Sequence, residues 1–179
     1  MSIKDLTKEK HDAAEHTAFM KAVFARTLPM ALWEDYTYQK VIWYRAIEKQ
    51  ARAAGLLDDL AGLERADLIL EDYNEMMKGR LAEYHTYKDV SKDYTIYVNR
   101  LTDKNKIMAH LYVWHMGDMF GGQMIKKIIE APHKHLEFDN SKEMIMKVRA
   151  MLTDDMADEA NIAFEWAIRI LKEYDESLG

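Results

Sequence analysis

A histidine and a glutamate near the N-terminus have a spacing that could support metal-ligand chemistry. His11 and Glu15 are four residues apart, which places them one turn apart on the same face of a helix. A metal-bound histidine usually donates its second ring N–H to a carboxylate or carbonyl, which fixes the tautomer and increases ligand basicity. Considered alone, the pair is better explained as an ordinary exposed contact between neighbouring helical turns.

A second stretch contains three glycines within what is otherwise expected to be one long helix. These are Gly117, Gly121 and Gly122, and each glycine inside a helix costs roughly 1 kcal/mol relative to alanine. Gly117 and Gly121 share one helix face, so the bare backbone predicts the close approach of either another helix or a flat ligand. Asp118 beside this face favours the ligand, because a packing seam alone has no use for a carboxylate.

Among the other histidines, His110 is the rival metal ligand. It falls near the glycine face on a helical wheel, but no carboxylate lies one turn away from it, so we prefer His11. His115 points almost opposite Gly117 on the same wheel, which favours packing or surface exposure. The remaining histidines are expected to be solvated or hydrogen-bonded: His16, His85, His133 and His135.

Composition and motifs exclude several function classes. The chain has no cysteine, which excludes disulfides, thiolate zinc sites, iron–sulfur clusters and cysteine nucleophiles. A di-iron carboxylate centre needs Glu-x-x-His motifs on two helices, and the chain does not have two. Zinc-protease, serine-hydrolase and phosphate-loop motifs are missing as well. The net charge of −6 and the scattered lysines and arginines argue against a nucleic-acid partner.

The elements that must position these residues are expected to be helices in one all-α domain spanning residues 1–179. Hydrophobic residues make up 49% of the chain, with few glycines and prolines, which indicates a compact helical bundle. No apolar run approaches transmembrane length and no signal-peptide core is evident, so we expect a cytoplasmic protein without a membrane partner.

Helix boundaries follow from capping signals and apolar periodicity. Ser2 and Asp5 form a capping box that opens a helix running toward residue 24, and Leu28-Pro29 ends this region. Gly55 is the expected left-handed residue after a second helix. A loop is expected at 133–140, and Ser141 is the expected cap of the helix after it. The expected helices after the first are 34–54, 63–84, 92–101, 103–129, 141–152 and 154–177.

Together, the histidine helix and the glycine helix resemble the heme oxygenase family. Residues 6–20 are similar to the family's proximal helix, and the run Gly-Asp-Met-Phe-Gly-Gly-Gln at 117–123 is similar to its distal helix. The order of the two motifs, their separation and the chain length also fit. The resemblance implies an all-α bundle in which heme lies between the first helix and a distal helix kinked at its glycines.

The resemblance also implies roles for the matching residues. His11 would be the proximal ligand of the heme iron, and Glu15 would hold its other ring nitrogen. Gly117 and Gly121 would let the distal backbone approach the porphyrin.

On the distal side, the resemblance makes Asp118 the anchor of a water network that delivers protons, with Tyr44 as its second member. The remaining implied heme contacts are Lys4, Tyr112 and Arg149 for the propionates and Phe164 for the ring.

The implied reaction uses heme b as cofactor and substrate, together with dioxygen and external electrons. Its products in the family are biliverdin, ferrous iron and carbon monoxide, and the implied electron donor is a ferredoxin or a reductase. An acidic donor needs a basic docking surface near the heme edge. Candidate residues for this surface are Lys4, Lys8, Lys10, Lys126, Lys127 and Arg149.

Three distal positions depart from the family's pattern. Trp114 stands where an arginine is common, His115 where a tyrosine is common, and Phe120 where a small residue is common. Trp114 is expected near the glycine face, where its single N–H cannot replace the five donors of an arginine, so the water network would be smaller or rewired. One alternative is therefore a non-catalytic heme carrier or sensor on the same fold. Another is a helical interaction domain in which Gly117 and Gly121 form a packing seam.

Overall fold

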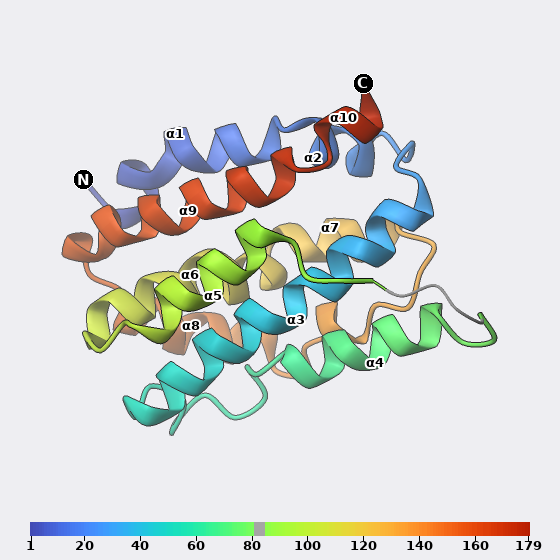
Figure 1. The fold of residues 1–179 in the computed structure, drawn as a ribbon. Coiled ribbons are helices and arrows are strands. Elements are labelled where there is room, and N and C mark those ends of the chain that lie inside the picture. Colours follow the sequence, from blue (N-terminus) through green and yellow to red (C-terminus); the bar gives the residue numbers. More distant parts are fainter. Residues whose placement is uncertain (81–84) are drawn as a thin grey trace.

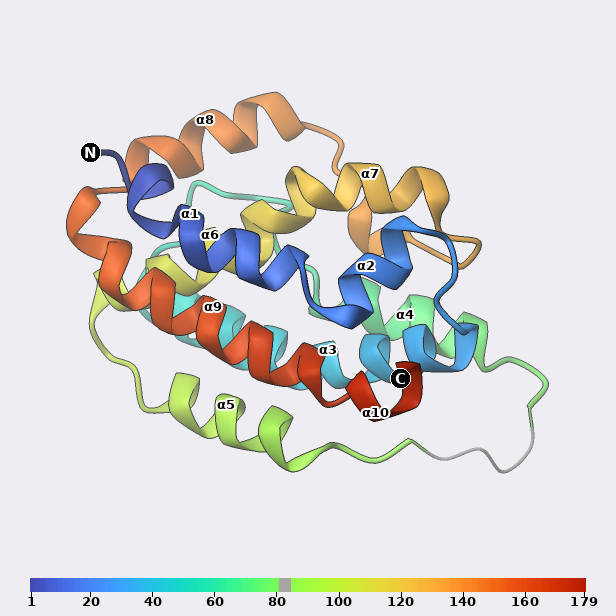
Figure 2. The same cartoon turned by 90° about the horizontal axis from the view of Figure 1, so that it is seen from above.

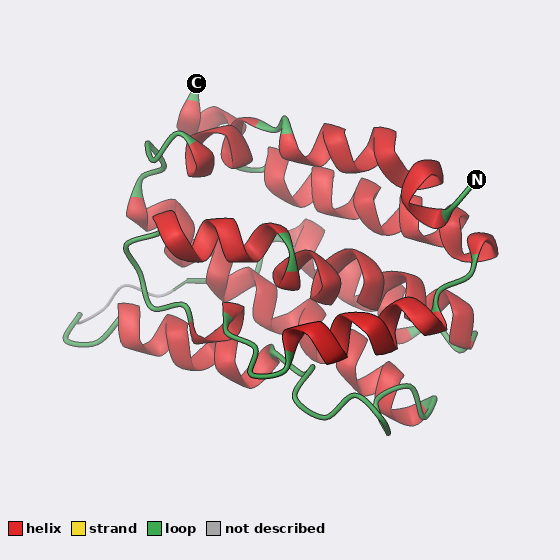
Figure 3. Ribbon diagram, turned by 180° about the vertical axis from the view of Figure 1, so that it is seen from behind, coloured by secondary structure: helices red, strands yellow, loops and turns green. Residues whose placement is uncertain are grey.

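The structure of the protein is a computed structural model that describes residues 1–80 and 85–179. Every regular element in these two ranges is helical, which confirms the predicted all-α class (Figure 3). The first five helices are α1 (Ile3–Glu15), α2 (Ala18–Phe24), α3 (Met30–Ala53), α4 (Ala66–Met76) and α5 (Asp89–Asn99). The others are α6 (Lys104–Met119), α7 (Gly121–Ile128), α8 (Ser141–Met151), α9 (Ala157–Lys172) and α10 (Asp175–Leu178), with 3₁₀ turns at Lys134–Leu136 and Asp154–Met156.

The centre of the fold is α3, which packs against α4, α5 and α6 (Figure 1). Val41, Trp43 and Ile47 on this helix are completely buried. Helices α1 and α9 lie side by side, and the view from above shows α8 and α7 on one side of this pair and α5 on the other (Figure 2). Neighbouring helices thus cover one another in a helical bundle.

Helix α6 is buried on nearly all sides rather than along one stripe. The Asp103 carboxylate accepts hydrogen bonds from the backbone N–H groups of Asn105 (2.8 Å) and Lys106 (3.1 Å), which starts the helix. Beyond its first turn, most side chains are buried, including those of His110, His115 and Asp118. A helix buried all round has no solvent face, so its polar side chains need partners inside the protein.

The first predicted helix is divided in two. Helix α1 begins at the predicted capping box, where the Asp5 N–H donates to the Ser2 hydroxyl and the Asp5 carboxylate accepts from the Ser2 N–H. It ends at Glu15, and the Thr17 hydroxyl accepts from the Met20 N–H and starts α2. One continuous helix to residue 24 was therefore wrong, because a threonine can cap a new helix as readily as it can continue an old one.

The glycine-bearing helix is also divided, at Phe120 rather than at a glycine. Phe120 has φ −107° and ψ −82°, which ends α6 before α7 begins at Gly121. The Gln123 amide donates to the carbonyls of Asp118 (3.1 Å) and Leu136 (2.8 Å), so a side chain satisfies a carbonyl that the break leaves free. Gly117 stays inside α6, and the kink expected at the glycines lies at the residue before Gly121.

The remaining boundaries agree with the predictions in part. Gly55 has φ +74°, as predicted for the left-handed residue after α3. Helix α3 starts earlier than expected, at Met30, with Pro29 in the N-cap position. Helix α4 ends at Met76, whereas the predicted helix ran to residue 84, and residues 81–84 lie outside the described ranges.

Two further boundaries near the C-terminus differ from the predictions. Asn140, not Ser141, occupies the N-cap position of α8, and its side chain makes no capping hydrogen bond. The last predicted helix is interrupted at Glu173 and Tyr174, which separate α9 from α10. Within the described ranges, no helix combines the length and the apolar character needed to cross a bilayer.

A buried carboxylate ties three helices together. Glu48 on α3 accepts hydrogen bonds from the N–H groups of Arg65 (2.7 Å) and Ala66 (3.2 Å) at the start of α4. It also contacts His115 Nε2 on α6 at 2.8 Å, and only 3% of its surface is exposed. Its removal would leave buried donors without an acceptor.

We therefore expect Glu48→Ala to lower the free energy of unfolding by about 3–5 kcal/mol, as for other broken buried pairs. Urea denaturation of the purified proteins measures this loss. The control is Glu64→Ala, which removes a carboxylate that pairs with Arg52 at the surface, and it should cost less than about 1 kcal/mol. Equal losses in the two variants would contradict a structural role for the Glu48 network.

Candidate functional site

A cleft of about 650 Å³ lies between α1 and the α6–α7 segment. Its volume falls within the range of roughly 300–1,000 Å³ typical of small-molecule sites. Among its lining residues are Lys4 and His11 from α1, Tyr112, Gly117 and Gly121 from α6 and α7, Arg149 from α8 and Phe164 from α9. Residues predicted from three distant parts of the sequence therefore meet at one cleft.

His11 lies on the α1 wall of the cleft with a carboxylate near each ring nitrogen. Its Nε2 is 3.4 Å from Glu15 Oε1, and its Nδ1 is 3.5 Å from Asp12 Oδ1. Its ring meets the ring of Phe164 edge-on, with centroids 5.8 Å apart and an interplanar angle of 88°. Whichever nitrogen turns into the cleft, a carboxylate is available to the other, which is the arrangement that suits a metal-binding imidazole.

The glycines divide into two groups according to what surrounds them. A Cβ added at Gly117 or Gly121 would meet no atom of residues 1–80 and 85–179 within 4 Å, and both glycines line the cleft. A Cβ at Gly122 would lie only 3.0 Å from Leu136 Cδ2. Close packing thus explains Gly122 alone. The packing seam proposed for Gly117 and Gly121 was wrong, because their bare backbone borders open space.

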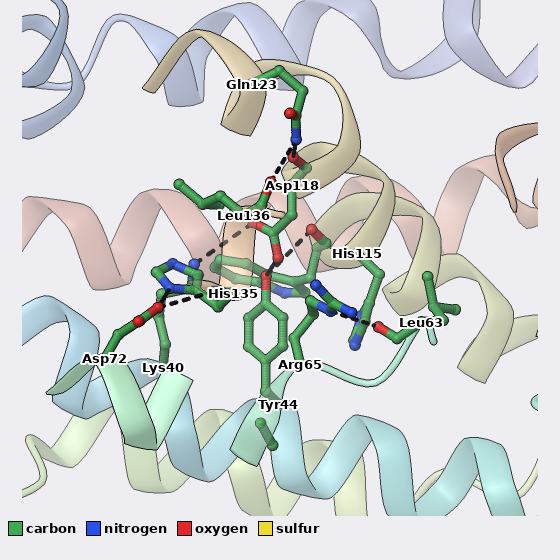
Figure 4. Close-up of polar contacts among 12 residues, drawn as sticks. Lys40, Tyr44, Leu63, Arg65, Asp72, His115, Asp118, Gln123, His135 and Leu136 are labelled. Atoms are coloured by element: carbon green, nitrogen blue, oxygen red, sulfur yellow. Dashed lines mark hydrogen bonds and ion pairs between the residues drawn. The ribbon is translucent and has the colours of Figure 1, made fainter. Parts of the chain in front are cut away.

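Asp118 and Tyr44 lie behind the glycine wall rather than in the lining. The Tyr44 phenol donates to Asp118 Oδ2 at 2.7 Å (Figure 4). It also reaches the Trp114 carbonyl at 3.2 Å. Burial, together with the nearby Asp118 carboxylate, raises the pKa of Tyr44 well above its ordinary value. Tyr44 is therefore a protonated donor at neutral pH.

Lys40 is a neighbour of Asp118 that the sequence analysis missed. Its Nζ lies 3.6 Å from Asp118 Oδ1, and the residue is 5% exposed. The sequence does contain a pattern that points to Lys40. Lys40, Tyr44 and Glu48 follow one another at intervals of four residues, which places three polar groups on one face of α3. The rest of that helix is rich in apolar and aromatic residues, so a polar stripe there needs polar partners.

His110 is not available as a metal ligand. It is completely buried and does not line the cleft. Its Nδ1 lies 2.6 Å from the Tyr94 hydroxyl, and its Nε2 lies 3.0 Å from Glu159 Oε2. The argument made against His110 from the sequence was incomplete. His110 does have a carboxylate partner, which comes from α9 rather than from its own helix.

The three departures from the family's pattern have separate environments. The Trp114 indole N–H donates to the Tyr94 hydroxyl at 2.8 Å, and Trp114 is not among the residues that line the cleft, so its single donor is not directed to Asp118. His115 is buried and pairs with Glu48, which agrees with the packing role that its place on the helical wheel favoured. Phe120 lines the cleft, and its ring lies 5.3 Å from the Arg149 guanidinium carbon.

The predicted basic docking surface is partly neutralised. Lys8 pairs with Asp12 at 2.5 Å, and Lys10 pairs with Glu165 at 3.2 Å. Lys4 and Arg149 line the cleft itself, and the last turn of α7 carries Lys126 and Lys127.

Comparisons with known proteins identify the family. The family model described as heme oxygenase matches residues 1–154. The chain is 24% identical to heme oxygenase 2 of Rattus norvegicus, and the match covers 98% of this chain but only 65% of that protein. It is also 24% identical to the heme oxygenase of Guillardia theta, over 99% of this chain and 86% of that protein. The chain thus spans about 65% of the length of its mammalian relatives.

Solved structures have the same fold. Heme oxygenase-1 of the cyanobacterium Synechocystis, in complex with heme, superimposes with a TM-score of 0.83 at 20% identity, covering 98% of this chain and 91% of that one. The heme oxygenase of Leptospira interrogans gives a TM-score of 0.84 at 20% identity, covering 97% of this chain and all (100%) of that one. The family match, with which the fold agrees, shows that the chain belongs to the heme oxygenase family.

Proposed function

We propose that the protein cleaves heme to biliverdin, ferrous iron and carbon monoxide, using dioxygen and electrons from an external donor. The observation that carries this proposal is the cleft in which His11 and the bare glycines Gly117 and Gly121 occur together, with the Asp118–Tyr44 pair behind the glycines. Bound heme supplies the iron that activates dioxygen and is itself the molecule that is oxidised.

On the α1 wall, His11 binds the heme iron through a neutral ring nitrogen, and Glu15 or Asp12 holds the other nitrogen. This role is supported by the position of the ring, which contacts Phe164 edge-on and lies on the cleft lining. Lys4, Arg149 and Tyr112 bind the two propionate carboxylates. Their role rests on their place in the lining and on the attraction between cationic or hydroxyl groups and carboxylates.

On the opposite wall, Gly117 and Gly121 let the ring system lie against the main chain, because neither has a side chain to occupy that space. Asp118 does not line the cleft, so a proton moves between its carboxylate and the cleft through ordered water. Such water needs two to four polar partners. The Asp118 carboxylate is one of them, and Tyr44 holds that carboxylate in place through Oδ2.

The donor is a ferredoxin or a reductase, and a cytoplasmic location suits both. The docking surface is formed by Lys126 and Lys127 in the last turn of α7, because Lys8 and Lys10 already pair with acidic side chains and Lys4 and Arg149 face the propionates.

The central test compares wild type with His11→Ala. We expect the wild type to bind heme with a characteristic Soret band and, when given dioxygen and an electron donor, to lose that band as biliverdin absorption appears. His11→Ala should change the heme spectrum and lose turnover, because the iron loses its protein ligand. His16→Ala is the control, since that exposed side chain interacts with the Asp12 carbonyl and does not line the cleft. Stable heme in the wild type without biliverdin would instead indicate a heme carrier.

Gly117→Ala should separate stability from heme binding. The added Cβ meets no protein atom, so the heme-free protein should gain up to roughly 1 kcal/mol from better helix propensity. The same methyl group takes space from the heme and should weaken heme affinity by roughly 1–3 kcal/mol, as in other overpacked sites. Thermal melting and heme titration measure the two effects.

The matched control is Gly122→Val, which crowds Leu136 instead of the cleft. It should destabilise the protein by about 1–3 kcal/mol and leave the heme affinity of the folded protein unchanged. If Gly117→Ala bound heme as tightly as wild type, the flat-ligand interpretation of the glycine wall would be wrong.

Reversal of charge at Lys126 and Lys127 to glutamate should raise the KM for an acidic donor at low salt, with the difference shrinking as salt is added. Steady-state kinetics at several ionic strengths measure this effect. Lys49→Glu with Lys78→Glu is the control, because these exposed lysines lie in α3 and just after α4, whereas Lys126 and Lys127 lie in α7, which contributes Gly121 to the cleft. An unchanged KM in the first variant would place the docking surface elsewhere.

A further inference from the structure

Asp118 has a cationic partner that comes from α3 rather than from its own helix. Lys40 Nζ lies 3.6 Å from Asp118 Oδ1, while the Tyr44 phenol occupies Oδ2 at 2.7 Å. We propose that Lys40 is a positioning residue for heme cleavage, which fixes and neutralises the Asp118 carboxylate so that this carboxylate can hold the proton-delivering water. This inference rests on the proposed function.

The surroundings of Lys40 confine its ammonium group to this one place. The side chain of Lys40 is 6% exposed, and that of Asp118 is 10% exposed. The Nζ atom also lies over the rings of Tyr44 (5.1 Å to the centroid) and Tyr36 (5.6 Å). A buried ammonium group is costly unless it is paired, so the carboxylate and the two ring faces together make this site acceptable.

Two other basic groups lie near Asp118, but each is engaged elsewhere. The Arg65 guanidinium donates to the main-chain carbonyls of Leu63 (3.2 Å), Glu64 (3.0 Å) and Glu137 (2.7 Å). The His135 ring, through Nδ1, contacts Asp72 Oδ2 at 2.6 Å.

His135 does not supply a second positive charge. Burial is the main cause that lowers its pKa, and the charge of Lys40 lowers it further. Burial raises the pKa of Asp72, but hydrogen bonds from His135 and from the Lys134 N–H outweigh it and lower the pKa. Asp72 is therefore an ionised carboxylate that accepts the hydrogen bond from His135. A neutral His135 then donates through Nδ1, and its buried Nε2, which has no hydrogen-bond partner among the described residues, is an acceptor. Figure 4 shows this ring beside Lys40 and Asp118.

The Lys40–Asp118 pair explains how this chain can do without the arginine that the family commonly has at the position of Trp114. The Trp114 N–H is directed to Tyr94, so it provides no donor to Asp118. Lys40 instead provides a charged partner from α3, as an ion pair at 3.6 Å. It leaves the cleft wall bare, because Lys40 does not line the cleft. Loss of Lys40 should therefore impair turnover much more than heme binding.

The experiment is a double-mutant cycle with Lys40→Met and Asp118→Asn, together with Lys40→Arg. Lys40→Met should lower the rate of biliverdin formation about 10–100-fold, the usual effect of removing a group that orients a functional side chain. Its heme affinity should stay close to wild type. Lys40→Arg should recover part of the rate. In the Asp118→Asn background, Lys40→Met should cause little further loss, because its effect runs through Asp118.

Two measurements that do not depend on turnover also test whether Lys40 acts through Asp118. The first is thermal melting of the four heme-free proteins of the cycle. Lys40→Met should lower Tm by on the order of 10 °C, because it leaves a buried carboxylate without its cation, and Asp118→Asn should remove most of that loss. The second is the C–O stretching frequency of carbon monoxide on ferrous heme, which reports the electrostatic field on the distal side. It should shift in Lys40→Met and much less in Lys40→Arg.

The matched control is Lys88→Met, which removes a lysine that also pairs with an aspartate (Asp35, 3.9 Å) and lies over a tyrosine ring (Tyr174, 5.2 Å). It should leave the rate and the C–O frequency unchanged. Independent losses from Lys40→Met and Asp118→Asn, or an unchanged C–O frequency in Lys40→Met, would overturn the inference. If the wild type bound heme without turnover, the proposed function would fail, while melting and the C–O frequency would still decide whether Lys40 acts through Asp118.

Discussion

The structure depends on the pairing of polar side chains between α3 and α6 inside the core. A buried polar group without a partner is strongly destabilising, so each of these side chains restricts where the facing helix can lie. Tyr44 and Lys40 meet Asp118, and Glu48 meets His115. The two contact points on α6 are three residues apart, so they fix both the position of α6 along α3 and its rotation about its own axis.

This rotation determines the chemistry of the cleft. With Asp118 and His115 directed toward α3, the backbone of Gly117 borders the cleft on the side of α1. The break at Phe120 then changes the direction of the chain so that Gly121 reaches the same cleft at the start of α7. A flat ligand can approach the main chain at both positions, and Gly122 uses its missing side chain to pack against Leu136 instead.

A second buried polar network holds the other side of α6. Trp114 donates to Tyr94, and His110 connects Tyr94 to Glu159 on α9. Burial opposes the ionisation of Glu159, but hydrogen bonds from His110 and Tyr97 outweigh it and lower its pKa. Trp114 and His115, two residues that depart from the family's pattern, thus anchor α6 to its neighbours. Lys40, rather than the side chain at position 114, is the cationic partner of Asp118.

Features carried within one helix could be predicted from the sequence. The helical class, the Ser2 capping box, the left-handed Gly55 and the shared face of His11 and Glu15 all depend on residues a few positions apart, whose geometry a helix fixes locally. The bare face shared by Gly117 and Gly121 was predictable for the same reason. The meeting of the two motifs at one cleft followed from the resemblance, because spacing alone does not bring distant helices together.

Features that join different helices were decided only by the tertiary structure. Three contacts join residues on different helices: the ion pair of Lys40 with Asp118, the pairing of His110 with Glu159 and the hydrogen bond from Trp114 to Tyr94. The repeat of a single helix cannot predict such contacts. The break at Phe120 belongs to this group, since Gln123 bridges it by bonding to the carbonyl of Leu136 in a later turn. A buried polar residue requires a hydrogen-bonding or charged partner. The sequence shows which polar residues are expected in the core, but only the packing of the helices determines which residue becomes the partner of each.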